Sequence, residues 1–168
     1  MWSWIALGVG GLLLSVVTLW VLLLVSLRTK FSPVLTAIRR LNRVVWNPRA
    51  MKAAGRPGAY ASVIRHTGRI TGTQYETPVG AVRTEDGFVI ALPYGTSSDW
   101  LKNLLAARSA VIVDEGETFR VDAPELVSVT SANRHFSPKE QRIHRLYGVD
   151  LCLSVRRFGL DVPVGNHL

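Results

Sequence analysis

Residues 64–80 read IRHTGRITGTQYETPVG, and this stretch decides how we interpret the rest of the chain. Apolar and polar residues alternate on either side of the two glycines, which predicts a pair of β-strands joined by a short turn. Gly68 and Gly72 permit a tight turn with positive φ, and Arg69 and the turn's backbone amides offer donors to an anion. The alternative is an ordinary hairpin turn with an exposed arginine.

The chain after residue 59 alternates short apolar runs with turn residues, as strand-rich folds do. We expect helices at Ser97–Arg108 and Pro138–Tyr147, while the tail through Phe158 is ambiguous. This pattern indicates a small β-barrel with helices outside it. The expected strands are Tyr60–His66, Tyr75–Arg83, Phe88–Pro93, Ala110–Asp114, Thr118–Val121 and Leu126–Thr130.

The first 27 residues carry no charged side chain, and residues 4–27 form one long apolar run. As a helix this run spans about 36 Å, enough to cross a hydrocarbon core of about 30 Å. A cleaved signal peptide is the alternative, but it would have a basic start and a shorter apolar segment. We therefore predict a transmembrane anchor at residues 1–27.

Positive charge is concentrated directly after this anchor. Residues 28–75 carry ten basic side chains and no acidic one, in a chain of net charge +8. The positive-inside rule then predicts a single-pass protein of the cell membrane with its body in the cytoplasm. Anionic membrane lipid is an expected partner, whereas nucleic acid is not, because aromatic residues do not interleave with the basic ones.

Residues 28–58 are interpreted as a basic amphipathic helix followed by a linker. Ser32-Pro33 predicts the start of the helix and Asn47-Pro48 its end. Its apolar stripe either lies along the bilayer surface or packs on the body, and the sequence leaves both open. Residues 59–168 then form the folded domain.

The residues alone indicate no metal site and no catalytic residue. The four histidines have no ligand-like spacing, and the single cysteine, Cys152, has apolar neighbours that indicate a buried thiol. On this chemistry the chain is a membrane-tethered, strand-rich domain with a basic glycine turn.

Five short motifs occur in a recognisable order: HTGRITG at 66–72, TPV at 77–79, GFVI at 87–90, YG at 94–95 and DWLKNL at 99–104. With them the chain resembles the deazaflavin (F-420)-dependent nitroreductase family, which is similar to the flavin-reductase split β-barrels. The resemblance covers about residues 60–127. It implies an α+β fold: a split β-barrel of about six mainly antiparallel strands with flanking helices, here after one transmembrane helix.

The resemblance implies a reduced 8-hydroxy-5-deazaflavin coenzyme, F-420, that gives a hydride to a quinone, nitro compound or activated alkene. Arg69 with the amides of Thr71 and Gly72 would hold the anionic tail of the coenzyme. The anchor favours a lipophilic, quinone-like substrate, and related folds make a homodimer possible. The cofactor-binding residues carried over are Arg69, Thr71, Gly72, Thr77, Pro78, Val79, Tyr94, Gly95, Trp100 and Asn103.

Three features depart from the family pattern. Ile70 and Tyr75 stand where basic residues are frequent, and the loop at residues 93–96 is short. The alternative function is therefore a split-barrel module that binds a cofactor without catalysis, or one that uses FMN.

Overall fold

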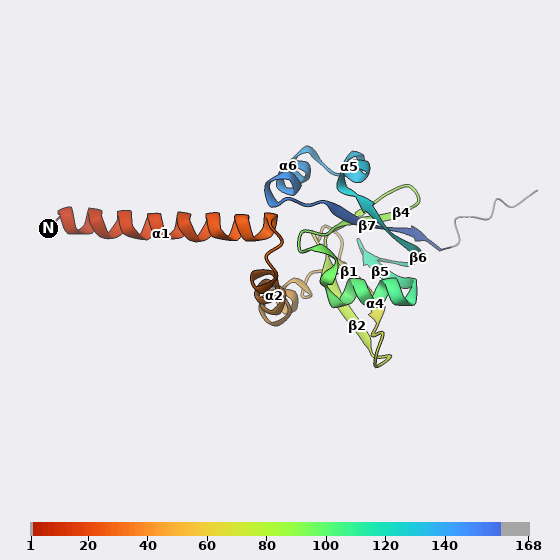
Figure 1. The fold of residues 1–168 in the computed structure, drawn as a ribbon. Helices are drawn as coiled ribbons and strands as arrows, with labels where there is room; N and C mark the ends of the chain where they lie inside the picture. Colours follow the sequence, from red (N-terminus) through yellow and green to blue (C-terminus); the bar gives the residue numbers. More distant parts are fainter. Residues whose placement is uncertain (1, 159–168) are drawn as a thin grey trace, which may run out of the picture.

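The computed structural model describes residues 2–158, without the side chains of residues 2–7 and of Ser32. The last ten residues of the predicted domain lie outside this range. Helix α1 (Trp2–Arg28) projects from the body as a single rod (Figure 1). Its segment Gly8–Arg28 has a mean hydropathy of 2.4 and is largely exposed, with Leu27 buried at its end. By length and composition it is suited to cross a membrane, although a signal sequence also fits this description.

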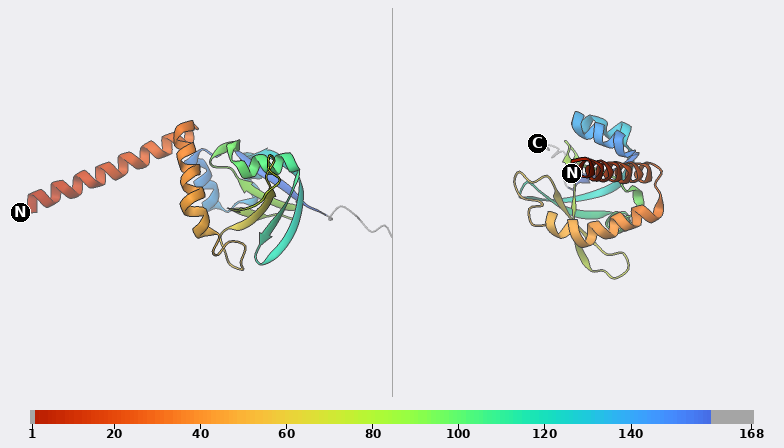
Figure 2. Two further views of the ribbon diagram at one scale, coloured as in Figure 1. Left: turned by 90° about the horizontal axis from the view of Figure 1, so that it is seen from below. Right: turned by 90° about the vertical axis from the view of Figure 1, so that its left-hand side faces the viewer.

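A second helical segment turns across the end of α1 (Figure 2). It comprises α2 (Ser32–Leu41), the π-helix η1 (Asn42–Trp46) and α3 (Asn47–Ala50). The predicted start is confirmed, but the predicted end at Asn47-Pro48 is wrong. The π-turn restarts the helix, and Pro48 then falls in a first turn, where its missing N–H costs no hydrogen bond.

Seven antiparallel strands form the body. They are β1 (Ser62–Thr67), β2 (Gln74–Val79), β3 (Ala81–Arg83), β4 (Gly87–Ala91), β5 (Ser109–Asp114), β6 (Glu117–Ser128) and β7 (Leu151–Arg157). Their order in the sheet is β2-β1-β5-β6-β7-β4-β3. The two edge strands, β2 and β3, are separated in the chain by Gly80 alone. The sheet must therefore curl until its edges meet, which confirms the predicted split barrel, with seven strands in place of about six (Figure 1).

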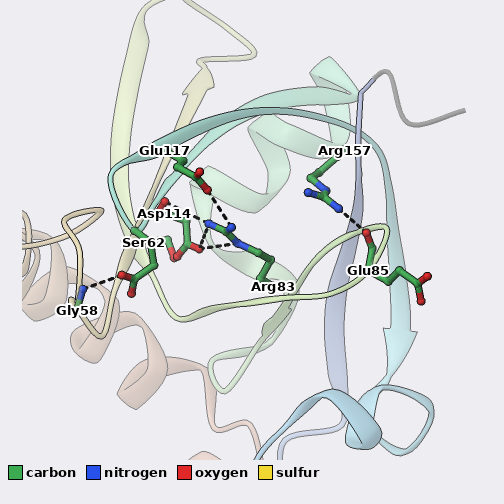
Figure 3. Close-up of polar contacts among 8 residues, drawn as sticks. Gly58, Ser62, Arg83, Glu85, Asp114, Glu117 and Arg157 are labelled. Carbon is green, nitrogen blue, oxygen red and sulfur yellow. Dashed lines mark hydrogen bonds and ion pairs between the residues drawn. The ribbon is translucent and has the colours of Figure 1, made fainter. Parts of the chain in front are cut away.

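Arg83, at the end of β3, reaches across the curled sheet to the β5–β6 turn (Figure 3). Its guanidinium donates to Asp114 at 3.0 Å and to Glu117 at 2.9 Å. It also lies over the Phe119 ring, 4.6 Å from the ring centroid. Because β3 does not pair with β5 or β6, these contacts join parts of the barrel that the sheet ladder leaves apart.

Helix α4 (Asp99–Ala107) covers the barrel and supplies Leu101 and Leu104 to its core. A second, smaller core lies where α5 (Val129–Ala132) and the residue after η3 (Asn133–His135) pack against β7. Cys152 belongs to this core, and burial raises the pKa of its thiol to about 11. The main core contains Ile64, Val79, Phe88, Ile90, Leu92, Leu101, Leu104, Ile112, Val121, Leu153 and Val155.

The structure corrects three expectations about strands. The predicted strand Tyr75–Arg83 is broken at Gly80, where the chain leaves one edge of the sheet for the other. The predicted strands Thr118–Val121 and Leu126–Thr130 both fall in β6, whose register shifts between Asp122 and Glu125, since Pro124 cannot donate to a ladder. Strand β7 comes from the tail left ambiguous above. The helix predicted at Pro138–Tyr147 is confirmed as α6.

Gly87→Ala should destabilise the barrel, because β4 approaches β7 too closely for a side chain. A Cβ at Gly87 would lie 1.9 Å from the carbonyl oxygen of Val155, whereas one at Gly80 would meet nothing nearer than 4.0 Å. Overpacking of this kind costs about 1–3 kcal/mol or more. We expect the midpoint temperature of thermal unfolding, measured on the full chain in detergent, to fall by at least about 5 °C in G87A and by clearly less in G80A. Equal midpoints would contradict the close β4–β7 approach.

Candidate functional site

The glycine turn between β1 and β2 is held by its own backbone. The amide of Gly68 donates to the Thr73 carbonyl at 2.7 Å, and that of Gly72 donates to the Gly68 carbonyl at 2.8 Å. A Cβ at Gly68 would meet the Tyr75 ring at 2.8 Å, and Gly72 has a φ of +69°. Each glycine is therefore required for a separate reason, close approach in one case and backbone conformation in the other.

Arg69 folds from this turn onto α4. Its backbone amide and Nη1 both donate to Asn103 Oδ1, at 3.2 and 2.8 Å. Its Nη2 lies 3.5 Å from Asp99 Oδ1. Arg69 keeps about a third of its side chain exposed, so it is positioned by α4 yet open to a ligand.

Behind Arg69 lies a buried polar chain of three side chains. Asn103 Nδ2 donates to His66 Nδ1 at 3.2 Å, and His66 Nε2 lies 3.2 Å from Thr77 Oγ1. Because the Asn103 amide nitrogen only donates, His66 accepts at Nδ1 and carries its proton on Nε2, which donates to Thr77. Burial lowers the pKa of His66 and the nearby Asp99 carboxylate opposes this shift, so the ring is neutral near pH 7.

Two further arginines reach the start of α4 from α2 and η1. Arg39 of α2 donates to Ser97 Oγ, and Arg43 of η1 lies 3.3 Å from Asp99 Oδ2. Arg43 and Arg69 thus pair with the Asp99 carboxylate, while Arg39 lies at Ser97. Three guanidiniums and one carboxylate leave a net charge of about +2 at this helix N-terminus. That terminus itself favours anions. The arrangement is thus suited to hold a negatively charged group.

A pocket of about 380 Å³ lies beside this cluster, between the α1–α2 junction and the loop after β4. Its walls are largely apolar, with a few polar groups. Lys30 is fixed at its edge by donation to the Gly148 carbonyl at 2.7 Å and by Asp150 at 3.9 Å. The pocket is lined by Lys30, Leu35, Arg39, Leu92, Tyr94, Gly95, Thr96, Ser97, Asp150 and Leu151. Its size and lining are those of a small-molecule site.

The residues expected from the resemblance divide into three groups in space. Arg69, Asn103 and Thr77 belong to the polar chain, and Tyr94 and Gly95 line the pocket. Trp100 is half-buried and packs against the core, and Pro78 is half-buried in β2. Thr71 and Gly72 are exposed in the turn.

Two residues of the expected site have other contacts in the structure. The Val79 side chain is buried in the core, so it does not line an open site. The Gly72 amide already donates within the turn, so it offers no hydrogen to an anion. Both follow from packing that the motif alone does not reveal.

Sequence reasoning missed His66, Asp99, Arg39 and Lys30. Each acquires its place through a contact between distant segments, such as Arg39 with Ser97. The signals in the sequence were the basic residues gathered in residues 28–75 and the motifs at 66–72 and 99–104, which begin with His66 and Asp99. Among residues 2–158, no group of three or more His, Cys, Asp or Glu side chains is arranged to hold a metal ion.

Comparison with known proteins gives one family. Residues 42–148 match the model of the F420H2-dependent quinone reductase family. The match begins after α2 and does not include α1. No curated protein matches the chain in sequence.

Solved structures give distant similarities. One, described as an F420-H2 dependent reductase (FDR-A), shares 10% identity over 56% of this chain and 94% of its own, with a TM-score of 0.43. Another, an F420 reductase, shares 11% identity over 63% and 90%, with a TM-score of 0.42. The haem storage protein HutZ of Vibrio cholerae shares 13% identity over 66% and 88%, with a TM-score of 0.43.

His66→Gln tests whether the buried ring is neutral. Burial lowers the pKa of His66 below its ordinary 6.5, so the unfolded chain binds a proton that the folded chain does not. Stability is therefore lost as the pH falls below about 6.5. We expect the thermal midpoint to depend less on pH between about 5 and 7 in H66Q than in the wild type. His135→Gln, outside the polar chain, is the control. An unaltered pH dependence in H66Q would show that His66 does not titrate as its burial requires.

Proposed function

The chain belongs to the F420H2-dependent quinone reductase family, and on that premise we propose that it is a membrane-anchored enzyme that reduces quinone-like acceptors at the bilayer surface. The family makes the chain an oxidoreductase with coenzyme F-420 as its cofactor, the first of the two cofactors expected from the sequence. The observation that carries the proposal is the convergence of three arginines on the start of α4, beside a pocket next to the foot of α1.

The donor set of this structure fits the coenzyme. F-420 joins a deazaflavin ring to a negatively charged tail, and the cluster at the start of α4 has the opposite charge. Arg69 would bind the tail, aided by Thr71 and by Arg39 from the other side of the helix start. The apolar walls of the pocket, including Leu35, Leu92 and Leu151, would cover a ring and exclude water.

The side chains of the candidate site then have separate roles. When bound, the reduced deazaflavin supplies a hydride and a proton, so that F420H2 and a quinone give F-420 and a quinol without another reductant. Asn103 positions Arg69, and His66 with Thr77 fixes the orientation of Asn103. Tyr94 and Gly95 form the wall nearest the membrane-proximal helices. Nitro compounds and activated alkenes are alternative acceptors that the same assay separates.

The membrane part of the proposal rests on three features. Helix α1 has the length and hydropathy of a membrane span, and basic residues follow it. The segment α2–η1 crosses the end of α1 and exposes Leu41, Val44 and Trp46, while Leu35 packs into the body. One part of the apolar stripe therefore packs on the body, and another part is exposed and could lie on a bilayer. We propose a cytoplasmic body whose exposed stripe meets the bilayer, and a homodimer stays a prediction.

Arg69→Ala should weaken coenzyme binding by at least about tenfold, because one charge-assisted contact to the tail is lost. Fluorescence titration of F-420 into the full chain in detergent measures the dissociation constant. Arg65→Ala is the matched control, since Arg65 lies on β1, four residues before Arg69, and pairs with Glu76 at 2.8 Å. If R69A and R65A bound F-420 equally well, Arg69 would have no role in the cofactor site.

Deletion of residues 2–27 should slow the reduction of a long-chain quinone dissolved in liposomes, because the anchor concentrates the site at the bilayer. Reduction of a short, water-soluble quinone should be unaffected, which also controls for folding of the shortened chain. Steady-state oxidation of reduced F-420 measures both rates. Equal rates of the two proteins on the membrane-dissolved quinone would remove the argument from the tether.

A further inference from the structure

A second hollow lies at the foot of α1, away from the pocket described above. It has a volume of about 280 Å³ and is lined by Arg28, Arg142, Arg145 and Leu146. Arg28 is the last residue of α1, and the other three belong to α6 (Pro138–Tyr147). Three cations from two distant segments thus surround one shallow site.

Hydrogen bonds fix α1 and α6 to each other at this point. Arg28 Nε donates to the Leu146 carbonyl at 3.1 Å, and Arg28 Nη2 donates to the Arg145 carbonyl at 3.0 Å. These are among the last carbonyls of α6, where few helical donors remain, and the Arg145 carbonyl also accepts from the Gly148 amide at 3.4 Å. The hollow is therefore built by the fold and does not depend on a chance approach of long side chains.

The charge of the hollow is not neutralised from within the described residues. Arg142 and Arg145 are exposed and make no ion pair among residues 2–158. The nearest acidic groups have other partners: Glu140 caps the start of α6 with Ser137, and Asp150 lies near Lys30. The hollow thus keeps a charge of about +3.

Apolar side chains stand beside these cations. Ile143 and Leu146 are 38% and 41% exposed on the same helix, and α6 flanks the foot of α1 opposite to α2 (Figures 1 and 2). A surface that combines arginines with exposed aliphatic side chains is typical of proteins that rest on the headgroup region of a bilayer. The foot of a membrane-spanning helix is where phospholipid phosphates lie.

We propose that this hollow binds the phosphate of an anionic phospholipid, with Ile143 and Leu146 against the start of its acyl chains. The proposal rests on the membrane-anchored arrangement proposed above and adds a specific lipid site to it. With one lipid bound here and the α2–η1 stripe on the other side of α1, the barrel is held at two points. The pocket beside α4 would then keep a constant orientation toward the bilayer.

The test uses the full chain in neutral detergent, titrated with a short-chain phosphatidylglycerol. Thermal stabilisation and native mass spectrometry report binding. We expect Arg142→Gln/Arg145→Gln to weaken binding by about tenfold or more, because two of three cations are lost. The control, Arg108→Gln/Arg120→Gln, removes the same charge elsewhere on the barrel. The Arg120 carbonyl accepts from Phe158, just after β7, and Arg108 precedes Ser109, which pairs with Asp122 of β6. This control should bind as the wild type does.

Control ligands and an activity assay distinguish lipid binding from general charge attraction. Phosphatidylcholine and inorganic phosphate should stabilise the wild type far less than phosphatidylglycerol, and equal stabilisation by inorganic phosphate would overturn a lipid site. Equal loss in both double variants would overturn the hollow in favour of general charge attraction. Reduction of a water-soluble quinone by F420H2, measured in parallel, should be unchanged in R142Q/R145Q. If neither the wild type nor any variant reduced the quinone, the proposed reductase activity would be rejected, while the lipid-binding result would still stand.

Discussion

The connection between β2 and β3 is the constraint on which the fold depends. These strands are the two edges of the sheet, yet a single residue, Gly80, separates them in the chain. The sheet therefore curls until its edges meet, and Arg83 reinforces the closure by contacts with Asp114 and Glu117 (Figure 3). Closure encloses the apolar faces of the strands, so every helix must lie outside the barrel. It also places the turn after β1 against the start of α4, where Arg69 meets Asn103.

The start of α4 links the candidate site to α2 and η1. Asp99 lies between Arg43 of η1 and Arg69 of the glycine turn, and Arg39 contacts Ser97, two residues before Asp99. Exposed ion pairs of this kind contribute little stability, each less than about 1 kcal/mol. Their effect is positional: they bring arginines from three segments to one helix N-terminus. A bound anion would compete with Asp99 for these arginines, so the site is preset for negative charge.

The sequence predicted the parts of the molecule that depend on local patterns. Hydropathy located α1, the capping residues around Pro138 located α6, and glycine spacing located the β1–β2 turn. The motif at residues 66–104 led to the family and to Arg69 and Asn103. What it missed depends on contacts between distant segments. No residue near His66 in the sequence indicates that its ring will contact Asn103. Strand β7 ends in basic residues that obscure its strand pattern, and its pairing with β4 and β6 identifies it.

A reductase transfers hydride from its cofactor to an acceptor, whereas a binding module holds the cofactor without reaction. A single-turnover experiment distinguishes the two most directly. The full chain in liposomes is loaded with reduced F-420 and mixed with a quinone that dissolves in the bilayer, and the absorbance of the oxidised deazaflavin is followed over time. We predict one equivalent of oxidised deazaflavin for each equivalent of quinone, and no change without quinone. Tight binding of F-420 with no oxidation by any quinone would contradict the account.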